Sequence, residues 1–460
     1  MSSRRDFLRL TVGAGTLLRV GAPALGKDGV RHAHSATAIT QVFGDGIRLT
    51  AVALAYDTPI LTAELSTASF QVEGRTIADV FTSTSADPAG RAAAGRFVIV
   101  MLSPEDANAP LAQKLSAPSD NATSAASAST ARTGGRSGPG NGGPGKAGDI
   151  PTYDTVYRTA QATLVQTRAL KTASGQVISA NSAALTTTAV KNPIVDDFRQ
   201  LEFCDAKTGK TLRYNLFIPN GYDPKRRYPL VLFMHDAGAT SDVTRTTLYQ
   251  GLGAIAWASP QDQARRPAFV LAPQYAELIA DDDSHTSAML DTTIDLIEDL
   301  ATHYSIDHQR LYTTGQSGGC MMSIAMDIKY PDFFAASFLV AGQWDPALVK
   351  PLARQKLWIL VSQDDDKAFP GQNAITEVLA EEGAKISRAT WDGTWTAEQF
   401  RAAFDQIDAE GSPVNYVTFA KGTVIPPGSS TAGASGHRNT WRIAHTIEPV
   451  REWIFRQRQS

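Results

Sequence analysis

One short turn constrains the fold more than any other stretch of the chain. In the segment RLYTTGQSGG, Arg310 to Thr314 form an apolar run typical of a buried strand. A Gly-x-Ser-x-Gly pattern centred on Ser317 follows, and a helical pattern begins directly after it. Gly315 and Gly319 have no Cβ atom, so strand and helix can approach closely. This arrangement predicts a tight, strained turn that holds the serine hydroxyl at the carboxyl edge of a sheet.

The second half of the chain repeats this alternation of strand and helix. Short runs rich in Val, Ile, Leu and Phe, among them PLVLFMH, AFVLAP and KLWILVS, are separated by helical patterns such as SAMLDTTIDLIEDLATHY. Parallel strands that are covered on both faces read as continuous apolar runs. We therefore predict an α/β domain over residues 198–457, with a mostly parallel sheet and helices on both faces. The serine turn in this setting predicts the α/β-hydrolase fold.

The first half has a different pattern. Residues 38–190 contain short alternating segments such as RLTAVALAY and RFVIVMLS, and no long amphipathic helix. This period of two predicts antiparallel strands with one buried face, and we expect a small immunoglobulin-like β-sandwich. Residues 116–149 are Gly, Ser, Ala and Pro with almost no large apolar side chain. Such a segment cannot bury enough surface to offset its ordering entropy, so we predict a disordered insert.

The first residues are typical of an export signal. Arg4 and Arg5 precede a weakly apolar stretch with small residues up to Ala24. This is the pattern of the twin-arginine route, so we expect a signal peptide over residues 1–24 and a periplasmic or secreted protein. The stretch is short and broken by Arg19, and no other stretch is long and apolar enough to span a membrane.

Charge and cysteine content exclude several classes of function. The net charge of −3 gives no electrostatic case for binding nucleic acid or an anionic membrane. Cys204 and Cys320 are too few for a disulfide framework or a thiolate metal site, and both lie in segments that we expect to be buried. The acidic run DDDSH, residues 281–285, could bind a cation, but a solvated helix start is favoured. We predict no metal and no cofactor.

A serine hydroxyl needs a base, and that base needs an orienting acid. In α/β-hydrolases the three follow one another as serine, acid and histidine. His437 and His445 are the histidines after Ser317. His437 lies in the small-residue loop STAGASGHRNTW, which can reach the edge of the sheet, whereas His445 adjoins a helix that must stay packed. We therefore favour His437.

The acid should follow the strand KLWILVS. Asp364, Asp365 and Asp366 stand there in a row, and position alone barely separates them. The helix after the serine offers the backbone N–H of Gly318 to a developing oxyanion. A second donor should follow the strand PLVLFM, where Ala237 is the favoured residue.

Other candidates around this turn have less support. His235 precedes the serine in the chain and fits a structural role in the turn that contains Ala237. Tyr275, Gln316 and Trp344 are predicted to bind the substrate.

Several of these motifs together resemble a known family. The turn at MHDAG, RLYTTGQSGG, the loop DDKAFPG and the segment GHRNTWRIAHTIEPVREWIF are similar to exported esterases of the polyhydroxybutyrate-depolymerase-like branch. That branch includes predicted peptidases and esterases with an N-terminal immunoglobulin-like domain. The resemblance covers about residues 38–457, without the low-complexity insert.

The resemblance implies a serine carboxylesterase with a Ser–Asp–His triad. It places the nucleophile on Ser317, the base on His437, the acid on Asp365 and the first oxyanion donor on Ala237. Position 364 is aspartate where the family has a small residue, so Asp366 stays an alternative acid. The letters MHD replace the family's usual LHG, which leaves the oxyanion geometry less defined.

The sequence therefore predicts a serine carboxylesterase that forms an acyl-enzyme and acts on small or polymer-derived esters. A serine peptidase or a polyester depolymerase with the same triad is the first alternative, because the triad also cleaves amides. The second is a catalytically silent protein whose β-domain binds a polymer or a partner. The β-domain could also hold a homo-oligomer together.

Overall fold

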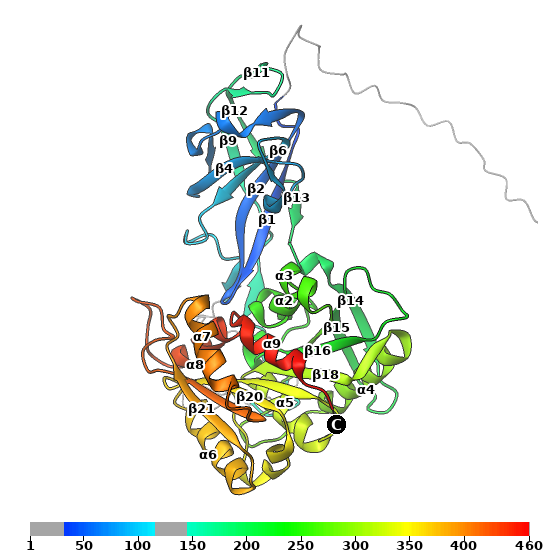
Figure 1. Ribbon diagram of the computed structural model, residues 1–460. Coiled ribbons are helices and arrows are strands. Elements are labelled where there is room, and N and C mark those ends of the chain that lie inside the picture. Colours follow the sequence, from blue (N-terminus) through cyan, green and yellow to red (C-terminus); the bar gives the residue numbers. More distant parts are fainter. Residues whose placement is uncertain (1–31, 116–144, 460) are drawn as a thin grey trace, which may run out of the picture.

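The computed structural model describes residues 32–115 and 145–459 (Figure 1). The predicted signal peptide, residues 1–24, lies outside the described residues, and so does most of the predicted insert. The described chain forms a β-domain that stands on a larger α/β domain (Figure 1).

The N-terminal domain is a sandwich of two sheets. The larger sheet has the order β13 (Ala189–Lys191), β1 (Ser35–Phe43), β2 (Gly46–Leu61), β6 (Ala94–Leu102), β4 (Ile77–Ser83), β5 (Arg91–Ala92). The smaller sheet has the order β12 (Asn181–Thr186), β9 (Thr163–Gln166), β3 (Phe70–Val72). Two short ribbons pair β7 (Ala112–Lys114) with β8 (Thr155–Tyr157), and β10 (Leu170–Lys171) with β11 (Val177–Ile178). The predicted β-sandwich is confirmed.

Strand β2 shows why the alternating pattern gives this packing. Successive side chains of a strand point to opposite faces. Val52 and Leu54 belong to the main core, while Ala51 and Ala53 pack with Phe81 in a small cluster of their own.

The second domain is built on a sheet with the strand order β14 (Arg199–Cys204), β15 (Thr211–Phe217), β17 (Phe269–Gln274), β16 (Tyr228–Met234), β18 (Ile306–Gln316), β19 (Ala336–Val340), β20 (Leu357–Ser362), β22 (Val414–Phe419), β21 (Ile386–Trp391). Strands β14, β15 and β17 pair antiparallel, and the pairs from β17 to β21 are parallel. Every residue of β16 is buried, as expected for a strand covered on both faces.

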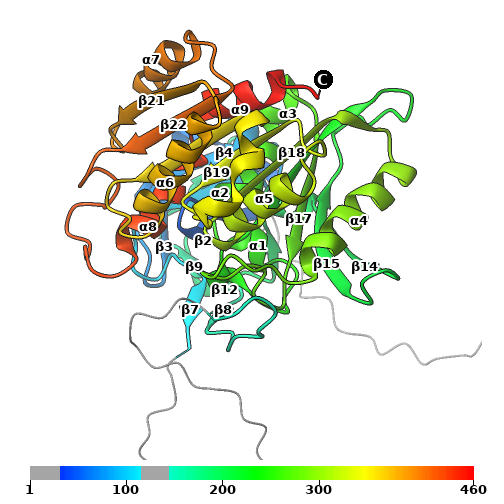
Figure 2. The ribbon, with the colours of Figure 1, turned by 90° about the horizontal axis from the view of Figure 1, so that it is seen from below.

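Helices cover both faces of this sheet. They are α1 (Thr246–Tyr249), α2 (Leu252–Ala258), α3 (Pro260–Arg265), α4 (Met289–His303), α5 (Gly318–Lys329), α6 (Ala368–Glu381), α7 (Ala397–Asp408), α8 (Ser435–Ala444) and α9 (Glu448–Arg456). Helices α5 and α6 lie on the face turned away from the β-domain, and α2 and α8 lie on the other face (Figures 1 and 2). The predicted α/β-hydrolase fold is confirmed.

The two domains touch at the turn between β1 and β2. A Cβ atom on Gly44 would lie 2.4 Å from the carbonyl oxygen of Arg442, so only glycine fits this approach to α8. Nearby, the rings of Tyr157 and Tyr249 pack with their centroids 5.1 Å apart. The β-domain therefore packs directly on the helix that carries His437.

Part of the predicted insert is ordered. The backbone N–H of Gly148 donates to the carbonyl oxygen of Leu278 at 2.7 Å, and the N–H of Leu278 donates to the carbonyl oxygen of Asp149 at 2.8 Å. The prediction of disorder is therefore wrong for residues 145–149. Composition could not reveal this, because backbone groups make these hydrogen bonds and need no apolar side chain.

Both cysteines are free thiols. Cys320 is buried as expected, but Cys204 is exposed at the end of the edge strand β14, so the expectation of burial is wrong for that residue. Among the described residues, no helix combines the length and the apolar character needed to cross a membrane.

Candidate active site

The site is built around the sharp turn between β18 and α5. Ser317 adopts φ +52° and ψ −118°, a conformation that L-residues rarely take and that costs about 1–3 kcal/mol. The two glycines make the turn possible. A Cβ on Gly319 would lie 2.1 Å from the carbonyl oxygen of Met234, and a Cβ on Gly315 would lie 2.3 Å from the carbonyl carbon of Gly319. The strained turn therefore exists only because strand and helix can approach at glycine.

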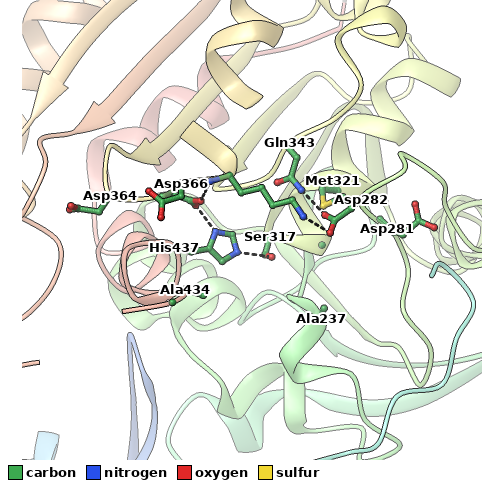
Figure 3. A pocket seen from close by; sticks show the side chains of 15 residues that line it. Ala237, Asp281, Asp282, Ser317, Met321, Gln343, Asp364, Asp366, Ala434 and His437 are labelled. Atoms are coloured by element: carbon green, nitrogen blue, oxygen red, sulfur yellow. Dashed lines mark hydrogen bonds and ion pairs between the residues drawn. The ribbon is translucent and has the colours of Figure 1, made fainter. Parts of the chain in front are cut away.

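Three of the predicted residues form a continuous hydrogen-bonded chain. Nε2 of His437 lies 2.9 Å from Oγ of Ser317, and Nδ1 of His437 lies 2.5 Å from Oδ2 of Asp365. Figure 3 shows the imidazole reaching toward the serine. A carboxylate can only accept, so Nδ1 carries the proton and Nε2 is the acceptor for the serine hydroxyl. The structure places His437 in the first turn of α8 and not in a loop as expected.

Only one of the three consecutive aspartates reaches the imidazole. Asp365 is 3% exposed, and its Oδ1 accepts from the backbone N–H of Ala368 at 2.8 Å and of Lys367 at 3.2 Å. Asp364 instead accepts from the N–H of Gly422, and Asp366 is exposed.

The surroundings of Asp365 keep it ionised. Burial acts to raise the pKa of its carboxyl group, but the hydrogen bond and charge of His437, with the two backbone N–H groups, hold that pKa below its usual value. A carboxylate that stays charged can orient and stabilise the imidazole.

Packing fixes the imidazole as well. The ring of Trp441, one turn further along α8, meets the ring of His437 edge-on with the centroids 4.8 Å apart. The contact limits rotation of the ring, and the sequence analysis used this tryptophan only through the family resemblance.

Two backbone N–H groups lie beside the serine. Ala237 and Gly318 line the same cavity as Ser317, and a Cβ on Gly318 would lie 3.6 Å from the nitrogen of Ala237. Within the described residues, neither N–H has a hydrogen-bond acceptor. Two free donors next to a nucleophile can stabilise negative charge on a carbonyl oxygen.

Two side chains that precede Ala237 hold its loop in place. Asp236 caps the short 3₁₀-helix η5 (Ala237–Ala239) by accepting from the N–H of Gly238 at 2.8 Å. Nε2 of His235 accepts from the N–H of Tyr275 at 3.0 Å, so its Nδ1–H donates to the carbonyl oxygen of Asp236 at 2.8 Å. Burial lowers the pKa of His235, which keeps this ring neutral. This agrees with the structural role expected for His235.

The three predicted substrate-binding residues do not line the cavities at Ser317. Tyr275 is fully buried, and its hydroxyl bonds to Thr293 at 2.9 Å. Trp344 is 6% exposed and belongs to the core. Gln316 is 1% exposed and hydrogen-bonds to Asp236 and His445. The substrate-binding role predicted for all three is therefore wrong.

A first cavity at Ser317, about 340 Å³, has a partly charged wall that the sequence analysis missed (Figure 3). Asp282 forms an ion pair with Lys367 and accepts from Nε2 of Gln343 at 2.9 Å. Met321 and Ala280 supply an apolar part of the wall. The aspartate belongs to the DDDSH run, whose position in the sequence gives no sign that it meets the serine turn.

A second cavity, also about 340 Å³, adjoins the serine. It shares Ser317, Ala237 and His437 with the first cavity. Residues 151–154 of the β-domain form part of its wall, and the hydroxyl of Tyr153 donates to the carbonyl oxygen of Ala276 at 2.7 Å. The N-terminal domain therefore contributes to the surroundings of the serine.

The acidic run was also weighed as a cation site. One ligand atom each from Asp281, Asp283 and His285 lies within 4.8 Å of the others. The carboxylate of Asp281 already accepts from three backbone N–H groups, those of Ala147, Asp283 and His285. These bonds support a structural role in the turn.

Comparisons with known proteins agree with this architecture. Residues 35–179 match the family model described as the esterase Ig-like N-terminal domain. The crystal structure of a thermostable esterase superposes with a TM-score of 0.72 at 24% sequence identity, over 92% of this chain and 100% of that chain. A search of curated proteins found no match.

A more distant likeness covers about half of the chain. The S954A mutant of the feruloyl esterase module from Clostridium thermocellum, complexed with sinapinate, aligns at a TM-score of 0.38 and 13% identity, over 55% of this chain and 86% of that chain. It is too remote to bear on the site. The chain thus joins an N-terminal immunoglobulin-like domain of the esterase type to an α/β-hydrolase domain, and its fold is shared with the thermostable esterase.

Proposed function

We propose that this protein is a serine carboxylesterase with Ser317 as nucleophile, His437 as general base and Asp365 as the orienting acid. The observation that carries the proposal is the unbroken chain from Asp365 through His437 to Ser317, beside two free backbone N–H groups. The esterase-type N-terminal domain supports the choice of an ester as substrate.

In the first half-reaction, Oγ of Ser317 attacks the carbonyl carbon of the ester while Nε2 of His437 takes the hydroxyl proton. The N–H groups of Ala237 and Gly318 donate to the oxyanion that forms. The tetrahedral intermediate then collapses, and His437 delivers its proton to the alcohol oxygen as the C–O bond breaks. The alcohol leaves, and the acyl group stays on the serine.

In the second half-reaction, His437 takes a proton from a water molecule that attacks the acyl-enzyme. Collapse of the new intermediate returns the proton to Oγ and releases the carboxylic acid. Asp365 stays ionised throughout and stabilises the imidazolium. Apart from the ester and this water molecule, each step uses side chains and backbone groups of this chain.

The two cavities that adjoin the serine give the ester room for two different parts. The apolar wall formed by Met321 and Ala280 suits an acyl chain. The second cavity, with Tyr153 and Trp441 in its wall, would then take the alcohol portion. Two cavities of about 340 Å³ fit small or oligomer-sized esters.

A substrate panel tests the proposal. p-Nitrophenyl esters of increasing acyl length, peptide p-nitroanilides and a polyester emulsion are offered to the wild-type protein and to Ser317→Ala. We expect turnover of the esters, little turnover of the anilides, and a loss of about 10³-fold or more in kcat for Ser317→Ala. Faster turnover of anilides than of esters would identify a peptidase instead, and no turnover at all would favour the silent binding protein.

We also propose that the protein is exported by the twin-arginine route, on the strength of Arg4 and Arg5 and the weakly apolar stretch that follows them. Replacing both arginines by lysine should retain the full-length precursor in the cytoplasm of a bacterial host. Unchanged export of that variant would contradict the proposed route.

A further inference from the structure

A series of hydrogen-bonded polar side chains runs from a buried histidine to a half-buried aspartate beneath the serine turn, and the mechanism above does not use it. Nε2 of His445 lies 3.1 Å from Oε1 of Gln316, and Nε2 of Gln316 lies 2.9 Å from Oδ2 of Asp236. His445 is at the end of α8, Gln316 directly precedes Ser317, and Asp236 directly precedes Ala237. The chain therefore links the helix of the proposed base, the proposed nucleophile and the proposed oxyanion donor.

The carboxylate at one end determines which group donates and which accepts in each of these hydrogen bonds. Asp236 can only accept, so the amide nitrogen of Gln316 must face it. The amide oxygen of Gln316 then faces His445 and accepts from its Nε2–H. The imidazole is thus the neutral tautomer with the proton on Nε2, and burial lowers its pKa to about 3. Each bond in the chain has one donor and one acceptor.

Packing alone does not account for an imidazole at this position. His445 is 2% exposed and lies edge-on between Phe233 and Phe338, with ring centroids 5.7 and 5.8 Å apart. Within the described residues, its Nδ1 has no hydrogen-bond partner. A buried polar atom without a partner lowers stability, and an apolar side chain would avoid this cost. The bond to Gln316 is therefore the distinctive contribution of this residue.

The backbone of His445 is also anchored. Its carbonyl oxygen accepts from Nη1 of Arg451 at 2.8 Å, and Arg451 forms a buried ion pair with Asp262 at 2.7 Å. The ring consequently has little freedom to follow a displaced Gln316.

At the other end, Asp236 uses its second oxygen to accept from the N–H of Gly238. Asp236 thus fixes the turn in which the N–H of Ala237 stays free. We propose that His445 is a positioning residue which, through Gln316 and Asp236, holds the Ala237 N–H in place for the oxyanion. This inference rests on the proposed esterase function.

The test compares two replacements of the same ring. His445→Leu introduces an apolar side chain of similar size and removes the hydrogen-bond donor. His445→Gln keeps a hydrogen-bond donor of similar reach. We expect His445→Leu to lower kcat about tenfold while KM changes less than about twofold, because the oxyanion forms only in the transition state. His445→Gln should recover most of the lost kcat.

A second readout separates positioning from packing. A trifluoromethyl ketone forms a tetrahedral adduct with the serine and places its oxyanion on the same donors. Its affinity for His445→Leu should fall by the same factor as kcat, and the melting temperature should stay within a few degrees of wild type. Unchanged kcat and unchanged ketone affinity in His445→Leu would overturn the proposal.

A double-mutant cycle tests the route through the chain. His445 and Asp236 do not bond to each other, so independent effects should add. We expect that adding His445→Leu to Asp236→Ala lowers kcat by less than about twofold, because Asp236→Ala has already broken the series of hydrogen bonds. Full additivity would overturn the proposal. If His445→Leu does not fold, Gln316→Met takes its place in the cycle.

The outcomes distinguish this inference from the proposed function. A wild-type protein that hydrolyses no ester contradicts the esterase function itself. An active wild-type protein whose His445→Leu variant keeps its kcat contradicts only the positioning role.

Discussion

Gly44 of the β-domain and Arg442 of α8 meet so closely that a Cβ atom on the glycine would lie 2.4 Å from the carbonyl oxygen of the arginine. His437 lies on the same helix, five residues before Arg442. The contact couples the position of the N-terminal domain to the helix of the proposed base.

Replacing Gly44 should therefore disturb both stability and activity. The new methyl group in Gly44→Ala has a backbone atom as its neighbour, so the domains or α8 must shift. We expect a loss of about 1–3 kcal/mol in the free energy of unfolding and a severalfold lower kcat, measured by denaturant melts and ester hydrolysis. Asp45→Ala in the same turn removes only a surface ion pair with Arg48 and serves as the control. Equal behaviour of the two variants would show that the contact is unimportant.

Asp365→Asn should be the damaging replacement among the three neighbouring aspartates. The amide can present an N–H to the imidazole and favour the wrong tautomer, so we expect kcat to fall by a factor on the order of 10³ to 10⁴. Asp366→Asn, at an exposed position one residue further on, is the matched control and should stay within about twofold of wild type. A crippled Asp366→Asn with an active Asp365→Asn would move the acid to residue 366.

A buried carboxyl group in α5 should make stability depend on pH. Burial raises the pKa of Asp327 to about 7, and among the described residues its Oδ2 has no hydrogen-bond partner. An aspartate in the unfolded chain titrates near 3.9. The folded state therefore binds the proton more tightly, so this group's contribution to stability is complete below about pH 4 and is lost as the pH rises toward 7.

The corresponding measurement compares melting temperatures of wild type and Asp327→Asn from pH 4 to pH 8. The variant lacks this titration, so its stability relative to wild type should improve with rising pH, by an amount on the order of a few kcal/mol. Asp332→Asn, at an exposed site just beyond the helix, should show no such trend. Parallel curves for wild type and Asp327→Asn would mean that the carboxyl group does not titrate in this range.

Tyr153 tests the contribution of the β-domain to substrate binding. Tyr153→Ala removes the ring from the wall of the second cavity, whereas Tyr153→Phe removes only the hydroxyl that bonds to Ala276. With acetate esters of increasing alcohol size, we expect Tyr153→Ala to raise KM severalfold for the bulky alcohols and to leave acyl-length preference alone. Tyr153→Phe should stay close to wild type. A change confined to acyl-length preference would reverse the assignment of the two cavities.

Much of the fold was predictable because its signals are local. Strands β16 and β20 are nearly continuous apolar runs. The glycines on both sides of Ser317 mark a tight turn between a strand and a helix. Because the base follows the serine and the acid along the chain, few histidines are candidates, and His437 could be predicted from the sequence. Separating Asp365 from its neighbours required the family resemblance, because adjacent residues in a loop differ only in where the backbone turns.

What could not be predicted depends on contacts between distant segments. Tyr275 and Trp344 follow strands just as cavity residues do, and only the tertiary packing turns them into the core. Residues 145–149 have no large apolar side chain from which their docking on the second domain could be predicted. The pairing of Asp282 with Lys367 joins loops 85 positions apart in the sequence.

The most direct test of the central claim is mass spectrometry of the intact protein after treatment with a fluorophosphonate. Such a reagent transfers one phosphonyl group to an activated serine and releases fluoride. We predict a single added group on the wild-type protein, located by peptide mapping on Ser317, with ester hydrolysis lost in proportion and no labelling of Ser317→Ala. Full ester hydrolysis by a protein that remains unlabelled, or labelling at another residue that abolishes activity, would contradict the assignment of Ser317 as the nucleophile.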